Sequence, residues 1–187
     1  QVPGVYIRPE EGYGFFPNIS LRGTDPNRSQ KVTILEDGIP SSPSPFSDPS
    51  AYYSPTAGRM AGFEILKGSS QLKYGPNTTG GVINYLSTPI PNEQKSHLRA
   101  SYGSHNEIIS HAYSGGKTAL GGGQFGYLVE LFDHRSDGWK HADMETLLGQ
   151  RNKEMPISKT DIMVKFSYEM GDDDYFEFKA GRTFMDS

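Results

Sequence analysis

Four apolar segments, each punctuated by glycine, dominate the first half of this 187-residue chain: NISLRG at residues 18–23, ILEDGIP at 34–40, FEILKG at 63–68 and YGPNTTGGVIN at 74–84. Each apolar run is as long as a single β-strand, and the glycines that follow favour turns. Long connections between them contain prolines, which cannot donate to a sheet ladder. The pattern predicts a small mixed α+β domain over residues 1–92, with long ordered loops of the kind that often carry function.

The expected elements of this domain follow from the apolar runs. The alternation around Ile19 and Leu21 indicates a strand with one buried face. A short helix is expected to begin at Thr56 and to end at Met60, since threonine is a favoured residue at a helix start. Further strands are expected at residues 4–7, 31–35, 63–66 and 82–86.

The second half of the chain has a different period, because strict alternation begins at Ser96. We expect five antiparallel strands, each of about 9–11 residues, which is the length of a tilted membrane strand. Tight connections are expected at 103–106 and 171–173, a glycine-rich turn at 115–123 and a long loop at 136–159. The expected strands cover residues 96–102, 106–113, 124–134, 161–170 and 173–182.

The two faces of these strands differ in polarity. Apolar side chains fill one face, while the other carries Arg99, Glu130, Lys165 and Glu177. A soluble antiparallel sandwich also alternates, so the period alone leaves two architectures open. The charged face favours the wet interior of a transmembrane β-barrel, of which residues 93–187 would form the first strands.

Composition excludes several classes of function. A net charge of −4 with mixed signs gives no basic surface for nucleic acid, and the absence of cysteine excludes thiolate metal sites. The five histidines lack a paired metal-ligand spacing, so no metal site is expected. The glycine pattern at 121–126 precedes an alternating strand where a dinucleotide-binding loop needs a helix. Since no nucleophile–base motif is present, the chain is not expected to be an enzyme.

The order and spacing of the segments ISLRG, LEDG, EILKG, YGP and GGVIN resemble the plug domain of TonB-dependent outer-membrane receptors. The segment PFSDP at 45–49 resembles the ferric-citrate-type branch. The resemblance implies a plug inside a barrel of about 22 strands in the outer membrane of a Gram-negative bacterium. It also implies import of ferric citrate or another ferric siderophore, with energy relayed by TonB and inner-membrane proteins. The barrel would contact outer-membrane lipid, and the chelate would be cargo, with no cofactor.

Two features of the family pattern are not found in this sequence. The TonB box, a short segment before the plug, is missing, and the alternating half accounts for only about five strands. Five strands would leave unpaired edges in lipid. We therefore expect the chain to be part of a larger receptor, comprising most of the plug and the first barrel strands.

The resemblance assigns candidate residues to two roles. Three plug loops, at 8–16, 25–30 and 44–49, would face the ligand, although their side chains also suit ordinary polar loops. Arg22 and Lys67 would latch the plug to barrel glutamates, with a surface ion pair as the alternative. The candidate ligand-binding residues are Arg8, Tyr13, Arg28, Gln30, Phe46, Ser47 and Asp48.

The main competing function is that of a β-rich surface or secreted binding module with no role in transport. Such a module would also be rich in alternating strands. The series of plug-like segments within residues 18–84 separates the two hypotheses, because a sandwich has no reason to contain it.

Overall fold

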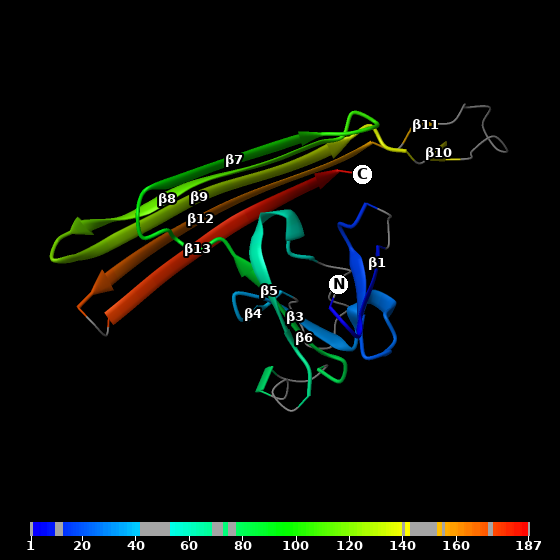
Figure 1. Ribbon diagram of the computed structural model, residues 1–187, viewed down its shortest axis with the longest axis horizontal. Helices are drawn as coiled ribbons and strands as arrows, with labels where there is room; N and C mark the ends of the chain where they lie inside the picture. The colour runs from blue at the N-terminus through cyan, green and yellow to red at the C-terminus, as the bar shows by residue number, and fades with distance from the viewer. Residues whose placement is uncertain are drawn as a thin grey trace. The chain divides into compact units, whose positions relative to one another are not determined.

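The computed structural model describes residues 2–9, 13–41, 53–68, 73–74, 78–139, 141–142, 153–154, 156–171 and 174–186. The chain divides into two compact units, unit 1 over Gln1–Thr88 and unit 2 over Pro89–Ser187. Figure 1 shows both units, and strands are the main regular secondary structure of the described residues in each. Within the described ranges, no helix is long and apolar enough to cross a membrane.

A four-stranded mixed sheet forms the centre of unit 1. The two inner strands run parallel, and Val32 is the register partner of Gly81. Both have nearly continuous apolar sequences, as expected for parallel strands that are covered on both faces. The order across the sheet is β4 (Ile39–Pro40), β3 (Val32–Glu36), β6 (Gly81–Ser87) and β5 (Met60–Leu66).

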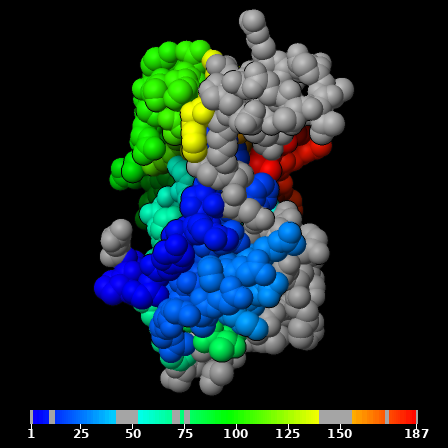
Figure 2. Space-filling model, turned by 90° about the vertical axis from the view of Figure 1, so that its right-hand side faces the viewer, coloured from blue at the N-terminus to red at the C-terminus, as the bar shows by residue number. Residues whose placement is uncertain are grey.

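A two-stranded hairpin of β1 (Val5–Pro9) and β2 (Pro17–Leu21) accompanies this sheet in unit 1. The space-filling view shows the N-terminal segment at the surface, where most of β1 is exposed (Figure 2). The expectation of one buried face for β2 was wrong, because Asn18, Ile19, Ser20 and Leu21 are all buried. The short turn η1 (Asn27–Ser29) packs against β2 and bonds to it, which explains why its polar residues are covered as well.

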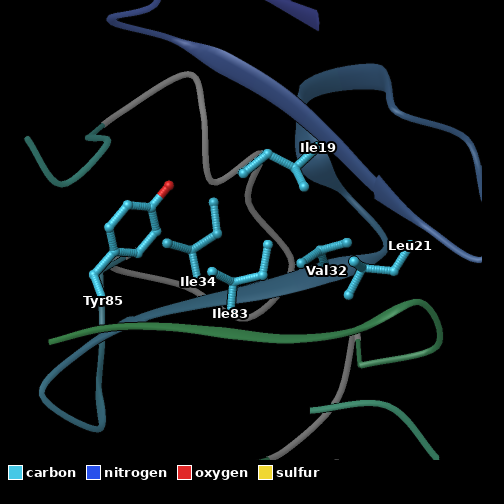
Figure 3. Packing of buried hydrophobic residues seen from close by; sticks show 6 residues of the cluster. All are labelled: Ile19, Leu21, Val32, Ile34, Ile83 and Tyr85. Carbon is cyan, nitrogen blue, oxygen red and sulfur yellow. The ribbon is translucent and has the colours of Figure 1, made fainter. Parts of the chain in front are cut away.

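The core of unit 1 joins the hairpin to the sheet. Figure 3 shows side chains of β2, β3 and β6 gathered into one cluster, with Val5, Met60 and Ile65 packed partly against it. The ring of Phe63 meets the ring of Tyr85 edge to face, at 4.9 Å between centroids. The cluster consists of Ile19, Leu21, Val32, Ile34, Ile83 and Tyr85.

The helical part of the prediction was wrong in detail. Instead of a helix from Thr56 to Met60, the chain forms a three-residue 3-10 turn, η2 (Ala57–Arg59), and the Thr56 side chain makes no cap. Strand β5 begins at Met60 and pairs with β6, so the backbone is extended where the helix was expected to continue. Within the described part of unit 1, the helical elements are the 3-10 turns η1 and η2.

Unit 2 contains an open antiparallel sheet of five strands, and the expected number and antiparallel pairing are confirmed. A separate two-stranded pair, β10 (His141–Ala142) and β11 (Lys153–Glu154), lies within the connection from β9 to β12. The strand order is β13 (Asp174–Asp186), β12 (Ile157–Met170), β9 (Gly123–Ser136), β8 (Ile108–Leu120) and β7 (Lys95–Tyr102).

The strands of unit 2 are longer than expected. Strands β8, β9, β12 and β13 have 13 or 14 residues, and the turn expected at 115–123 contains only Gly121 and Gly122. Gly115 and Gly116 lie inside β8, at positions where neighbouring atoms approach the backbone closely. A Cβ on Gly115 would lie 2.6 Å from the backbone oxygen of Tyr127. These glycines allow close packing and do not mark a turn.

The register gives the sheet one apolar and one polar face. Leu98, Ala112, Leu131 and Ile162 are successive cross-strand partners, and the large apolar side chains among them are exposed. On the opposite face, several charged side chains are nearly completely buried. They include Glu130, Lys159, Asp161 and Lys165. The predicted separation of polar and apolar faces is therefore confirmed.

Candidate functional site

Four of the predicted ligand-binding residues belong to neighbouring elements at one end of the β1–β2 hairpin. Arg8 in β1 is the register partner of Asn18 in β2, and Tyr13 lies in the connection between these strands. The backbone nitrogen of Arg28, in η1, donates to the side-chain oxygen of that same Asn18, at 2.7 Å. Gln30 follows directly after η1, and its nitrogen bonds to the carbonyl of Asn27. The structure thus connects residues from two predicted apices.

Two buried polar side chains fasten η1 to β2. Asn18 is 3% exposed and accepts from Arg28, while Ser29 is fully buried. The Ser29 hydroxyl accepts from the backbone nitrogen of Ile19 at 2.9 Å and donates to the carbonyl of Pro17 at 3.1 Å. A buried polar group is costly unless it is hydrogen-bonded. Here the bonds also fix the position of the loop.

The backbone at this junction is strained. Arg28 has φ 47° and Ser29 has φ 57°, in the left-handed region that non-glycine residues rarely adopt. Each such residue costs on the order of 1–3 kcal/mol and persists only where its surroundings hold it. The Asn18 and Ser29 hydrogen bonds provide that support, so the loop that carries Arg28 is held in one conformation.

The exposed side chains at this end of the hairpin suit recognition of oxygen-rich anions. Arg8, Arg28 and Gln30 are exposed, and Tyr13 is half-buried. Guanidinium groups bind carboxylates through two parallel hydrogen bonds, and the Tyr13 ring offers an apolar surface. Three further predicted ligand-binding residues, Phe46, Ser47 and Asp48, lie outside the described residues.

The two predicted latch residues make contacts within unit 1. Arg22 donates from Nη2 to the carbonyl oxygens of Thr79 and Gly80, at 3.2 and 3.4 Å, and so joins the end of β2 to the start of β6. Lys67, after β5, donates from Nζ to the carbonyl of Pro3. Both residues thus hold segments of unit 1 together. Their pairing with barrel glutamates stays a prediction.

A polar network that the sequence did not predict surrounds the turn from β3 to β4. Asp37, at φ 51°, accepts from the backbone nitrogen of Ser87 at 2.9 Å. The Asn84 side chain accepts from the nitrogen of Gly38 at 2.8 Å and donates to Glu64 at 2.9 Å. These bonds fix the turn against β6, so the network serves the architecture of unit 1.

A second buried network lies at one end of the same sheet. Arg59 is 3% exposed and forms an ion pair with Glu36 at 2.7 Å, and the Tyr53 hydroxyl donates to Glu36. Burial also raises the pKa of the Tyr85 hydroxyl, and a hydrogen bond to Ser54 acts in the opposite direction. No local sequence pattern predicts these pairs, because their members lie far apart along the chain.

The polar face of unit 2 is a network of ion pairs and rings. Glu130 is fully buried and lies 2.8 Å from the His111 ring nitrogen. The ring of His97 stacks on that of Tyr113, with 5.2 Å between centroids. Among the described residues, no group of three or more His, Cys, Asp or Glu side chains could hold a metal ion. Two further pairs join Lys117 to Glu169 at 2.7 Å and His134 to Glu107 at 2.9 Å.

Comparison with known proteins gives a family match for unit 1. Residues 1–82 match the family model of the TonB-dependent receptor plug domain. The match covers all seven candidate ligand-binding residues and both latch residues. The homologous TonB-dependent receptors are transporters and not enzymes.

Solved structures are similar to this chain over nearly its whole length. The ferric yersiniabactin uptake receptor FyuA from Yersinia pestis matches with a TM-score of 0.72 and 20% identity, over 97% of this chain and 27% of its own. The siderophore receptor PirA from Acinetobacter baumannii gives 0.67 and 17%, over 99% and 28%. The ferric citrate transporter FecA, in its unliganded form, gives 0.52 and 18%, over 97% and 36%. At such identities the likeness shows the fold, and the chain spans about a quarter to a third of these proteins.

Proposed function

Residues 1–82 form a plug domain of the TonB-dependent receptor family, and from this premise we propose that the chain is the plug and the first barrel strands of an outer-membrane receptor for a ferric chelate. The match to the plug family carries the proposal. It favours a receptor over a β-rich binding module without transport, because such a module would have no plug domain.

The proposed mechanism is binding followed by a rearrangement of the plug, without a covalent step. The chelate is bound at the apices that carry Arg8, Tyr13, Arg28 and Gln30. TonB and its inner-membrane partners supply the energy that displaces part of the plug. The loop that carries Arg28 is held in one conformation by Asn18 and Ser29, so it provides a preorganised binding surface before energy is applied.

The sheet of unit 2 supports a location in the outer membrane of a Gram-negative bacterium. Its apolar face exposes large side chains such as Leu98, Leu131 and Phe178. Alternating strands with an exposed apolar face and a charged opposite face are typical of membrane barrels. We propose that this apolar face contacts outer-membrane lipid, and that the polar face lines the interior of the barrel.

The cargo is proposed to be a ferric chelate, either ferric citrate or another siderophore complex. The relatives described above include receptors for different chelates, so the citrate branch is the narrower form of the proposal. Exposed guanidinium groups at the apex support an anionic complex. The intact chelate, and no resident cofactor, would occupy the site.

Growth of a strain that lacks the full receptor tests this function. Plasmid-borne receptor should restore growth on ferric citrate or on one other ferric siderophore as the sole iron source. The rescue should disappear in a strain without TonB. Copper, cobalamin and nickel complexes complete the panel.

Rescue by cobalamin, nickel or copper alone would contradict the iron assignment. Rescue that persists without TonB would contradict the energised mechanism. An Arg8→Ala, Arg28→Ala double variant tests the binding surface itself. It should produce normal amounts of receptor but should require a higher chelate concentration for half-maximal growth.

A further inference from the structure

We infer that Asn18 and Ser29 are positioning residues, which hold the loop of Arg28 against the strand pair that carries Arg8 and so make a two-arginine anchor for an anionic chelate. This inference rests on the proposed function. It adds the residues that determine the geometry of the site and the charge class of ligand that the site accepts.

The first argument is burial. Asn18 and Ser29 are both almost inaccessible, yet their side chains are polar and lie beside the apolar core of unit 1. Polar groups in such places destabilise a fold unless they are hydrogen-bonded. The hydrogen bonds of Asn18 with Arg28, and of Ser29 with Ile19 and Pro17, all serve the junction between η1 and β2.

The second argument is backbone strain. Arg28 and Ser29 are consecutive residues with positive φ, and the Arg28 nitrogen is the donor in the 2.7 Å bond to Asn18. A non-glycine residue keeps this conformation only while its surroundings hold it. Without the Asn18 acceptor, we expect the loop to relax to ordinary backbone angles, and the Arg28 side chain then leaves its position.

The third argument is register. Asn18 is the cross-strand partner of Arg8, and partners across an antiparallel pair project from the same face with Cβ atoms about 5 Å apart. The buried Asn18 side chain therefore accepts a hydrogen bond from the backbone of Arg28 and also lies opposite Arg8 in the strand pair. The nearby carboxylate of Asp25 accepts from the nitrogen of Asn27 at 2.9 Å and is used within the loop.

The chemistry of the site then selects the ligand by charge. Two guanidinium groups on a fixed frame bind a chelate with several carboxylate or catecholate oxygens and repel a cationic complex. Ferric citrate and ferric enterobactin are suitable anionic probes. Ferrioxamine B, a cationic ferric trihydroxamate, is the opposing probe.

A double-mutant cycle in the purified full receptor tests the inference by equilibrium binding of these three probes. Arg28→Ala and Asn18→Ala should each weaken binding of the anionic probe by about tenfold. In the Arg28→Ala background, Asn18→Ala should have no further effect, because Asn18 acts through Arg28. Ser20→Ala, another buried polar residue of β2, is the matched control and should leave binding unchanged.

Hydrogen exchange provides a second readout that does not depend on the ligand. Asn18→Ala should speed exchange at residues 27–30, and Ser20→Ala should not. Additive losses in the cycle, unchanged exchange, or equal affinity for ferrioxamine B would each overturn the inference. If the wild-type receptor binds neither anionic probe, the charge assignment fails and the inference with it, whereas the proposed function is tested separately by rescue of growth on the siderophore panel.

Discussion

Arg22 shows how one residue combines backbone geometry with a side-chain role. Its φ is 55°, the next residue is Gly23 at φ 78°, and its guanidinium reaches the carbonyls of Thr79 and Gly80. Removing the side chain therefore loses hydrogen bonds, and it leaves a backbone angle that alanine tolerates less well than glycine.

Two substitutions at position 22 separate these effects. Arg22→Ala should destabilise the receptor by about 1–3 kcal/mol, since it removes charge-assisted hydrogen bonds. Arg22→Gly should be about 1 kcal/mol less harmful, because glycine adopts positive φ freely. Denaturant unfolding measures both variants. If the latch prediction also holds, both should raise permeability to large antibiotics; unchanged permeability would contradict the latch but not the contacts within unit 1.

The raised pKa of Tyr85 predicts that the stability of the fold decreases at alkaline pH. Burial raises the pKa of its hydroxyl above the ordinary value of 10.0. The folded state then favours the protonated form, so this contribution is fully present below pH 10 and is lost as the pH rises above 10. Each unit of pKa difference corresponds to about 1.4 kcal/mol.

The comparison of wild type with Tyr85→Phe isolates this residue. Urea unfolding at pH 8 and pH 11 should show a larger alkaline loss for wild type, because phenylalanine cannot ionise. Other tyrosines and lysines titrate in both proteins, so their contributions to the loss of stability cancel in the difference. Equal losses in the two proteins would mean that Tyr85 has the same pKa when folded and unfolded.

Among the elements, the strands were predictable and the connections were not. Period-two alternation located all five strands of the large sheet of unit 2, because each residue on one face meets neighbours of the same polarity. The glycines of β8 misled the prediction, since a glycine needed for close packing looks the same in sequence as one needed for a turn. The Asn18–Arg28 and Arg59–Glu36 contacts depend on tertiary pairing, which no local pattern encodes.

The apolar face of the five-stranded sheet gives a prediction for this element. Leu131 is 43% exposed near the middle of β9, on that face. If the face contacts lipid, Leu131→Arg should destabilise the receptor in a bilayer by about 2–4 kcal/mol. His97→Arg, an exposed position on the polar face, is the control and should be tolerated.

Refolding into lipid vesicles measures this difference. Folded barrels keep a shifted mobility on unheated gels, so the folded fraction of each variant can be compared over a urea series. Equal stability of the Leu131 and His97 variants would contradict the assignment of the lipid-facing side.

For the whole molecule, the connections indicate orientation in the membrane. The β8–β9 and β12–β13 turns lie at one end of the sheet, and the β7–β8 connection lies at the other end with the long β9–β12 connection. Outer-membrane barrels place short turns in the periplasm and longer loops outside. The end that contains residues 103–107 is thus expected to face the exterior.

Cysteine labelling tests this orientation, because the chain contains no cysteine of its own. Ser104→Cys should react with a bulky, membrane-impermeant maleimide in intact cells. Leu120→Cys, at the exposed end of β8, should react only after the outer membrane is permeabilised. The reverse labelling pattern would invert the assignment, and the unmodified receptor provides the background.

The parallel pairing of β3 with β6 has a consequence for biogenesis. Val32 cannot meet Gly81 until the whole intervening segment has been delivered, so the centre of unit 1 depends on contacts that are distant along the chain. Such topologies fold slowly, because loop-closure entropy is spent before the contacts form. A polypeptide delivered from its N-terminus can therefore pair β3 with β6 only after the local β1–β2 hairpin has become available.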